Sequence, residues 1–354
     1  MTIAILLDPV DLLFCRDGRP IVAGEGAAAG AGLPNPQVLT GAIRSALLRE
    51  RGQLPADGSK PKQEHLDAVM QVRVRGPLLA DLKHGLPFIP MPADLVGKKP
   101  KHGTESTPTA RLRPRRGVPG WQAPPDAPQA LPLWPLPEQA QADAPQHPRQ
   151  RPGDTAPQQG YLTWQGFDTW AKGGVPTAEH VKQASDLWLT ETRTNVALAV
   201  DTAVAADGML FSTRYVRLKT DIGFYVEIDG ADDLPTTLQL GGDRRQVQVR
   251  RLKEPVPWPA QGSVALALAP VILPQGRCPE DWKSHCTGLA ISGADPVSGW
   301  DLTKNDGKGA PRPTRWTIRA GAVWHLSQTI SNISIGSENE TGFGWIARGI
   351  APTA

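Results

Sequence analysis

The stretch from Thr190 to Lys253 constrains the fold most, because it alternates β-rich runs with turn-forming residues. Two of these runs, Val196 to Val200 and Leu210 to Leu218, stand on either side of Asp207-Gly208. An Asp-Gly pair between two such runs favours a tight hairpin, since both central residues of that turn need positive φ. We therefore expect antiparallel strands here, with a hairpin that turns at Asp207-Gly208.

A glycine-arginine segment, Gly241 to Arg245, follows these runs. Glycines let a backbone approach another group closely, and paired arginines bring cations to the same place. From Arg244 to Lys253 there are five basic residues and no acid. This arrangement would suit a phosphate chain, although basic runs are more often ordinary solvated surface.

The first hundred residues show a strand, a helix and then further strands. Ile3 to Leu7 is a compact apolar run, and Gln37 to Arg49 repeats apolar residues at helical spacing. Short apolar runs between residues 68 and 90 are separated by glycine and proline. This order fits a ferredoxin-like or RNA-recognition-type lobe.

The segment from 97 to 160 is different in composition, being rich in Pro, Gln, Ala and Arg with almost no apolar periodicity. Such a segment buries too little surface to offset its ordering entropy, so we expect an insertion that is mobile when free. Its basic half, with Arg111, Arg113, Arg115 and Arg116, serves either to clamp RNA or to solubilise the loop. Composition does not separate these two interpretations.

Several short motifs, in order along the chain, resemble the RAMP superfamily of CRISPR proteins. The closest resemblance is to the third-subunit family of the type III-B (Cmr) effector complex. The matching residues are Asp8-Pro9, Phe14 to Pro20, Pro34 to Pro36, Gly41 to Arg44, Tyr161 to Trp164, Glu191 to Asn195, Asp207 to Phe211, Gly241 to Arg245 and Gly342 to Gly344.

This resemblance implies an α+β fold with two ferredoxin-like (RRM-like) lobes and long insertions. We expect an N-terminal lobe at 1–96, the insertion at 97–160 and a C-terminal lobe with a glycine-rich loop at 161–354. The implied function is non-catalytic: holding the 5′ tag of the CRISPR guide RNA and linking the large polymerase-like subunit to the backbone RAMP subunits. It implies no cofactor, no metal and no membrane.

The resemblance also implies which residues contact RNA, through arginines and through backbone amides near glycines. These residues are Arg16, Arg19, Thr40, Gly41, Arg44, Arg193, Asn195, Arg214, Gly241, Gly242, Arg244, Arg245, Gly342, Phe343 and Gly344. By the period-two pattern of a strand, Phe211, Tyr215, Arg217 and Lys219 fall on one face, which would either stack bases or pack on a neighbouring lobe.

Two alternatives remain open at this point. A metal-independent RAMP endoribonuclease that processes guide precursors would need a general base and acid around one phosphate, with His285 or His325 and Arg315 as candidates. Nothing in their spacing brings them together, and a structural histidine is the more common case. The other alternative is a purely structural adaptor whose basic segments meet protein acids.

Cysteine usage and the N-terminus indicate a cytoplasmic protein. The three cysteines show no disulfide or Cys-x-x-Cys pattern, and Cys278, His285 and Cys286 lack a fourth ligand nearby. The first residues lack a basic leader, and the longest apolar run, Val264 to Leu273, is too short to span a bilayer.

Overall fold

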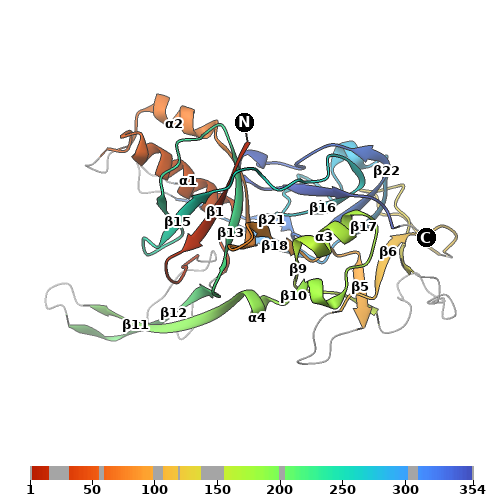
Figure 1. Ribbon diagram of the computed structural model, residues 1–354, viewed down its shortest axis with the longest axis horizontal. Coiled ribbons are helices and arrows are strands. Elements are labelled where there is room, and N and C mark those ends of the chain that lie inside the picture. The colour runs from red at the N-terminus through yellow and green to blue at the C-terminus, as the bar shows by residue number, and fades with distance from the viewer. Residues whose placement is uncertain are drawn as a thin grey trace.

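The computed structural model describes residues 2–15, 32–55, 60–98, 107–118, 120–136, 155–198, 204–301 and 310–352. Within these ranges the protein is mixed α+β, built mostly from antiparallel sheets with few helices (Figure 1). The expected fold class is confirmed. No helix in the described ranges is long and apolar enough to cross a membrane.

The first sheet has six strands in the order β14-β15-β1-β13-β2-β3. Their bounds are Thr237–Gln239 (β14), Gln246–Arg251 (β15), Thr2–Pro9 (β1), Ile222–Asp229 (β13), Arg73–Asp81 (β2) and Leu86–Pro87 (β3). β13 lies antiparallel between β1 and β2, and β15 lies antiparallel on the other side of β1. This is the split βαβ order of a ferredoxin-like sheet, with β14 in place of the second helix.

Strands from both expected lobes therefore build this sheet. β13 and β15 come from beyond residue 161, and they flank β1 at its centre. The limits at 97 and 161 thus do not separate one sheet from the other. The change of composition and the family resemblance suggested those limits, whereas the pairing partners of β1 lie more than 200 residues away.

Two helices, α1 (Pro36–Glu50) and α2 (Gln63–Met70), lie against one side of this sheet. Asn35 caps α1, since its Oδ1 accepts a hydrogen bond of 2.9 Å from the Val38 amide, and Pro36 occupies the first turn. Leu39 and Ile43 of α1 pack against Ile5 of β1 in one core. The expected helix over 37–49 is confirmed.

The second sheet has the order β17-β22-β16-β23, with all neighbours antiparallel. The strands span Cys286–Ala290 (β17), Val323–Ile330 (β22), Gly262–Ala267 (β16) and Ile346–Gly349 (β23). Counted along the chain, this repeats the strand order of the first sheet. The 3₁₀ turns η3 (Glu280–Trp282) and η5 (Asn339–Thr341) stand where a ferredoxin-like lobe has its helices.

Successive side chains of a strand point to opposite faces of its sheet. In both sheets each face packs into a hydrophobic core. Ala4 and Leu6 of β1 share a central core with Val264 and Leu266 of β16. The opposite face of β16 joins a third core around Trp324. The helix α3 (Trp164–Ala171) also packs into the central core through Phe167 and Trp170.

Part of the 97–160 segment is folded. A four-stranded sheet has the order β7-β6-β5-β8, with bounds Leu133–Leu136 (β7), Ala110–Pro114 (β6), Leu95–Lys98 (β5) and Thr155–Pro157 (β8). We expected an insertion that is mobile when free, because the segment lacks apolar periodicity. The strands are instead held by contacts with the rest of the chain, including a hydrogen bond from Leu131 to Thr287.

The remaining elements are short, apart from one hairpin. They are β4 (Ile89–Pro90), β9 (Tyr161–Leu162), β10 (Val181–Lys182), η2 (Ala178–His180), α4 (Ala184–Leu187), β18 (Ala294–Val297), β19 (Trp300–Asp301), β20 (Ala310–Pro311) and β21 (Arg315–Ile318). The hairpin consists of β11 (Trp188–Leu198) and β12 (Ala205–Leu218) and extends beyond the first sheet (Figure 1).

The hairpin is confirmed, but its predicted turn is wrong. Asp207 and Gly208 lie inside β12, and the chain reverses between Leu198 and Ala205, which pair with each other. Ten cross-strand pairs fix this register. At roughly 0.2–1 kcal/mol each, such pairs together outweigh the preference of one dipeptide for a turn.

Candidate nucleic-acid interface

The base of the β11–β12 hairpin meets two other segments, and together we call them the hairpin foot. These segments are Val10–Cys15, which follows β1, and the turn 240–245 before β15. Leu13 forms a bridge with Val216 of β12 through backbone hydrogen bonds of 2.8 and 2.9 Å. The rings of Phe14 and Tyr215 pack with centroids 5.1 Å apart, so a small apolar cluster fixes the hairpin to the body.

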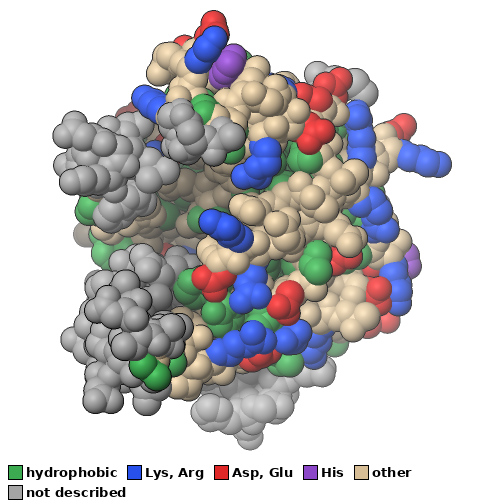
Figure 2. Space-filling model, turned by 90° about the vertical axis from the view of Figure 1, so that its left-hand side faces the viewer, with side chains coloured by type: hydrophobic (Ala, Val, Ile, Leu, Met, Phe, Trp, Pro, Cys, Tyr) green, Lys and Arg blue, Asp and Glu red, His purple; other side chains and the backbone are tan. Residues whose placement is uncertain are grey.

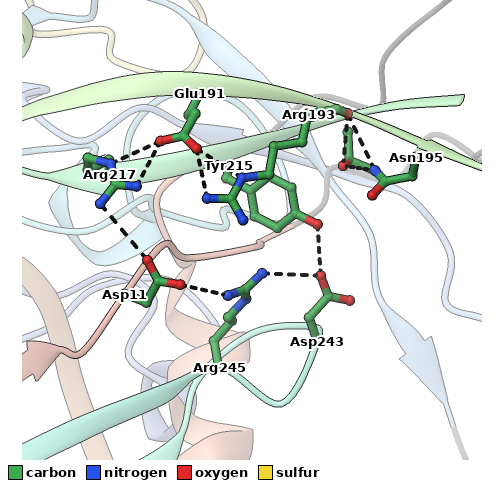
Figure 3. A network of polar contacts seen from close by, with 9 residues as sticks. Asp11, Glu191, Arg193, Asn195, Tyr215, Arg217, Asp243 and Arg245 are labelled. Carbon is green, nitrogen blue, oxygen red and sulfur yellow. Dashed lines mark hydrogen bonds and ion pairs between the residues drawn. The ribbon is translucent and has the colours of Figure 1, made fainter.

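A chain of alternating charges runs across the hairpin foot (Figure 3). Glu191 accepts hydrogen bonds of 2.9 Å from Nε of Arg193 at one oxygen and from Nε of Arg217 at the other. The hydrogen bond from Arg193, followed by that from Arg217, lowers the pKa of the Glu191 carboxyl. Glu191 is therefore ionised at neutral pH, and it holds two guanidinium groups in place.

Asp11 and Asp243 continue this chain. Nη1 of Arg245 lies 3.0 Å from Oδ2 of Asp11, whose other oxygen is 3.9 Å from Arg217. The Tyr215 hydroxyl donates to Asp243 at 3.0 Å, and Arg245 lies 3.8 Å from the same carboxylate oxygen. Three guanidinium groups thus face three carboxylates, for a net charge of zero, and a phosphate would have to compete with or displace an internal partner.

Tyr215 lies at the centre of this arrangement and is buried. The guanidinium carbons of Arg193 and Arg245 lie 5.5 and 5.1 Å from its ring centroid, within cation–π distance. Tyr215 and Arg217 share a strand face, as the period-two pattern predicts, and the ring is a packing centre rather than an open stacking platform.

Two predicted arginines of this region stand outside the charge chain. Arg214 is exposed and alternates with Tyr215, so that it points to the opposite face of β12. Arg244 is also exposed, on a backbone with φ of +50°. Among the described residues neither has a carboxylate within ion-pair distance, which leaves both guanidinium groups able to bind a phosphate.

The two predicted glycines of the turn approach the chain's own backbone. A Cβ on Gly241, whose φ is +80°, would lie 2.6 Å from the Phe14 carbonyl oxygen, and one on Gly242 would lie 2.8 Å from the Phe14 ring. The Gly242 amide also donates to the Phe14 carbonyl at 2.7 Å. The close approach expected for a phosphate is therefore used to seat the turn against Phe14.

A second group of predicted residues joins α1 to the glycine-rich loop. The Thr40 hydroxyl donates to the Thr341 carbonyl at 3.0 Å. Arg44 is only 8% exposed and donates to the carbonyls of Met70 and Val72 at 3.1 and 2.9 Å. We correct the assignment of Arg44 to RNA, because these buried hydrogen bonds engage its guanidinium within the protein.

The glycine-rich loop is packed in a similar way. Phe343 is buried, and a Cβ on Gly342 would lie 2.8 Å from the Val74 carbonyl oxygen. A Cβ on Gly344 would meet the Ile335 carbonyl oxygen. Gly41, in contrast, is exposed and has open space around it. Of this second group of predicted residues, only Gly41 lies on a surface that an RNA strand can approach without a rearrangement of the protein.

Of the remaining predicted residues, only Asn195 lies within the described ranges. Asn195 donates to the Thr213 hydroxyl at 2.7 Å, which braces the hairpin. Arg16 and Arg19 lie outside the described residues. The ends of that stretch are described, and the Gly32 amide donates to the Cys15 carbonyl at 3.1 Å. Burial raises the pKa of the Cys15 thiol to about 12, so this thiol stays protonated.

The residues predicted to contact RNA did not include Asp11 or Glu191, although both carboxylates hold predicted arginines in place. Glu191 begins the motif Glu191 to Asn195, but only Arg193 and Asn195 of that motif were assigned to RNA. The usable signal was the alternation of Glu191, Arg193 and Asn195 on one strand face. Figure 2 shows that acidic and basic side chains are also interspersed over one whole face of the molecule.

The histidines considered for nuclease chemistry do not form a site in the described residues. His325 is buried, and burial lowers its pKa to about 4, so it is neutral at pH 7. Arg315 forms an ion pair with Glu338 rather than facing either histidine. Nor do three or more His, Cys, Asp or Glu side chains in these ranges converge as metal ligands would.

Comparison with known proteins agrees with this fold. A chain of a type III-B Cmr-beta complex bound to cognate target RNA is 15% identical, with a TM-score of 0.50 over 91% of this chain and 86% of that chain. A chain of a Csm3–Csm4 subcomplex from a type III-A CRISPR-Cas interference complex is 11% identical, with a TM-score of 0.42 over 99% of both. No curated protein matches. A family model described as CRISPR-associated protein (Cas_Cmr3) matches residues 5–334, and the chain therefore belongs to the Cas_Cmr3 family.

Proposed function

We propose that this chain holds the 5′ tag of the guide RNA in a type III-B effector complex and is not itself catalytic. As a Cas_Cmr3 family member it is a subunit of a type III CRISPR effector complex. The similar fold comes from a type III-B complex bound to cognate target RNA, which supports an RNA-bound setting. A cytoplasmic location is part of the proposal. The proposed protein partners are the large polymerase-like subunit and the backbone RAMP subunits.

The observation that carries the proposal is the arrangement of arginines at the hairpin foot. Arg193, Arg217 and Arg245 are held by carboxylates, whereas Arg214 and Arg244 are exposed and have no carboxylate partner among the described residues. One guanidinium group can bind two oxygens of a phosphate at once. Its rigid, planar geometry fixes the position of an RNA backbone better than a flexible lysine does. A fixed hairpin with two available arginines is suited to orient a single strand.

A double substitution, Arg214→Ala with Arg244→Ala, tests the proposal directly. Each phosphate contact with a single strand contributes about 0.7 to the slope of log K against log salt, so the slope should fall by about 1.4. Binding of a tagged guide RNA is measured by fluorescence anisotropy at several salt concentrations. The matched control is Arg312→Ala, an exposed arginine that follows β20, lies outside the hairpin foot and also lacks an ion-pair partner among the described residues.

Recovery of RNA from the native host gives the second test. The tagged chain is pulled down, its RNA is sequenced, and the pure chain is assayed for cleavage of a guide precursor. Mature guides that share one 5′ end, without cleavage, support the proposal. Cleavage by the pure chain would establish the endoribonuclease instead, and a chain that joins the complex but neither binds nor retains RNA would be an adaptor.

A further inference from the structure

A polar groove lies between the C-terminal half of α1 and the β14–β15 connection, beside the hairpin foot. It measures about 810 Å³, within the range that holds a ligand of nucleotide or dinucleotide size. On the helix side it is lined by Ala46, Arg49 and Glu50, which share one helix face at spacings of three and four. The other side is formed by residues 234–239, Arg244 and Gln246.

The groove offers the donors and acceptors that a nucleotide needs. Arg49 and Arg244 are exposed, and no carboxylate among the described residues lies within ion-pair distance of either. Threonine hydroxyls and the amides of Gln239 and Gln246 line the rest of it, beside a single acid, Glu50. Guanidinium groups suit a phosphate, and side-chain amides can donate to and accept from base edges. This mostly polar lining with excess positive charge fits RNA better than an apolar peptide.

The turn before β15 explains how a single RNA strand could contact both the hairpin foot and the groove. Asp243 and Arg244 are consecutive non-glycine residues with φ of +55° and +50°, a conformation that costs of order 1–3 kcal/mol per residue. This backbone directs neighbouring side chains apart. Asp243 and Arg245 turn into the charge chain around Tyr215, while Arg244 lines the groove. Backbone strain of this kind is common at binding sites, where it holds a side chain in a functional position.

We propose that this groove binds one or two nucleotides of the guide RNA next to the segment held at the hairpin foot, with Arg49 and Arg244 on the intervening phosphate. The proposal rests on the proposed RNA-binding function and extends it to a second subsite. Arg244 belongs to both surfaces, so it marks the point where the strand passes from one to the other. Arg49 belongs to the groove alone and therefore distinguishes the two.

The test uses the assembled effector complex and guide RNAs that carry 4-thiouridine at each 5′-tag position in turn. After irradiation and digestion, we expect cross-links at residues 46–50 or 234–239, which line the groove and lie outside the hairpin foot, for one or two consecutive positions. Cross-links to the hairpin foot alone would overturn the groove and leave the tag-holding function standing. Protection of the groove by a protein subunit in place of RNA would also overturn it. A complete absence of cross-links to this chain would refute both proposals.

Charge reversal gives an independent measure. Arg49→Glu should weaken guide binding at least tenfold and reduce the salt slope by about 0.7, the value for one lost phosphate contact. Arg49→Gln should show the same reduction of the slope with a smaller loss of affinity. Ala68→Glu, at an exposed position on the neighbouring helix α2 outside the groove lining, changes the charge by −1 as Arg49→Gln does and should leave the slope unchanged. Equal effects of Ala68→Glu and Arg49→Gln would refute a specific phosphate contact.

Discussion

Substitution of Arg111 by methionine should destabilise the protein strongly, although Arg111 lies in the proline-rich segment. Its Nε donates to Asp94 at 2.7 Å and its Nη1 donates to the Trp170 carbonyl at 2.7 Å. The Trp170 indole donates to the other Asp94 oxygen at 2.9 Å. Both charged side chains are 0% exposed. The ion pair ties β6 to the residue just before β5, and the bonds to Trp170 tie both to α3 in the central core.

The magnitude follows from this burial. Removing one partner leaves a buried carboxylate without its cation, which typically costs 3–5 kcal/mol. Methionine retains much of the apolar volume of arginine, so the loss of charge dominates. In the double variant Arg111→Met with Asp94→Leu, no charge is stranded. What remains is the Trp170 indole N–H without a partner, at about 1–3 kcal/mol. The double variant should therefore be more stable than the single one.

Urea unfolding monitored by tryptophan fluorescence measures both variants. Arg113→Met is the matched control, because Arg113 lies on the same strand, is half-buried and has no carboxylate partner among the described residues. Its cost should stay below about 1 kcal/mol, as for most partly exposed positions. A cost for Arg111→Met as small as that of Arg113→Met, or a double variant less stable than the single one, would refute the reasoning.

Two further predictions concern stability. The folded pKa of His325 is lowered from 6.5 to about 4, so as pH falls below 6.5 the unfolded chain takes up a proton that the folded chain does not. The free energy of unfolding should then fall by up to about 3 kcal/mol between pH 6.5 and 4, and His325→Gln should remove this part of the pH dependence in urea titrations. Gly41→Ala should raise the thermal midpoint, since an exposed helical position gains about 0.5–1 kcal/mol. Gly344→Ala, where φ is +69° and the Cβ would meet the Ile335 carbonyl, should lower it by at least the equivalent of about 1 kcal/mol. An unchanged pH dependence, or equal shifts for the two alanines, would contradict these expectations.

Local patterns predicted the elements whose order depends on nearby residues. The helix α1 was expected at 37–49 and spans 36–50, because its apolar spacing and its Asn35-Pro36 start lie within one stretch of chain. The first strand was placed correctly for the same reason. The turn of the β11–β12 hairpin was not, since the pairing register depends on ten contacts between strands rather than on Asp207-Gly208.

The burial of charged residues could not be predicted from the sequence, because their partners are also distant along the chain. Arg111 has its partners 17 and 59 positions away, at Asp94 and Trp170. Arg44 has one 28 positions away, at Val72. An arginine in a polar segment is predicted to be exposed to solvent unless its distant partners are known. The resemblance to the RAMP family supplied the overall frame, but it did not show which arginines the protein uses internally.

The arrangement of arginines at the hairpin foot has a consequence for RNA affinity. Arg193, Arg217 and Arg245 carry no net positive charge together with their carboxylates, so the formal charge of +3 for the whole chain is not concentrated there. Attraction over long distances is weak under these conditions, and screening at physiological salt limits it to about 8 Å. Under the proposed function, selectivity then comes from the positions of Arg214 and Arg244, which the charge chain fixes indirectly by holding the hairpin and the turn. A protein built in this way should bind a strand that fits the path and should discriminate against polyanions in general.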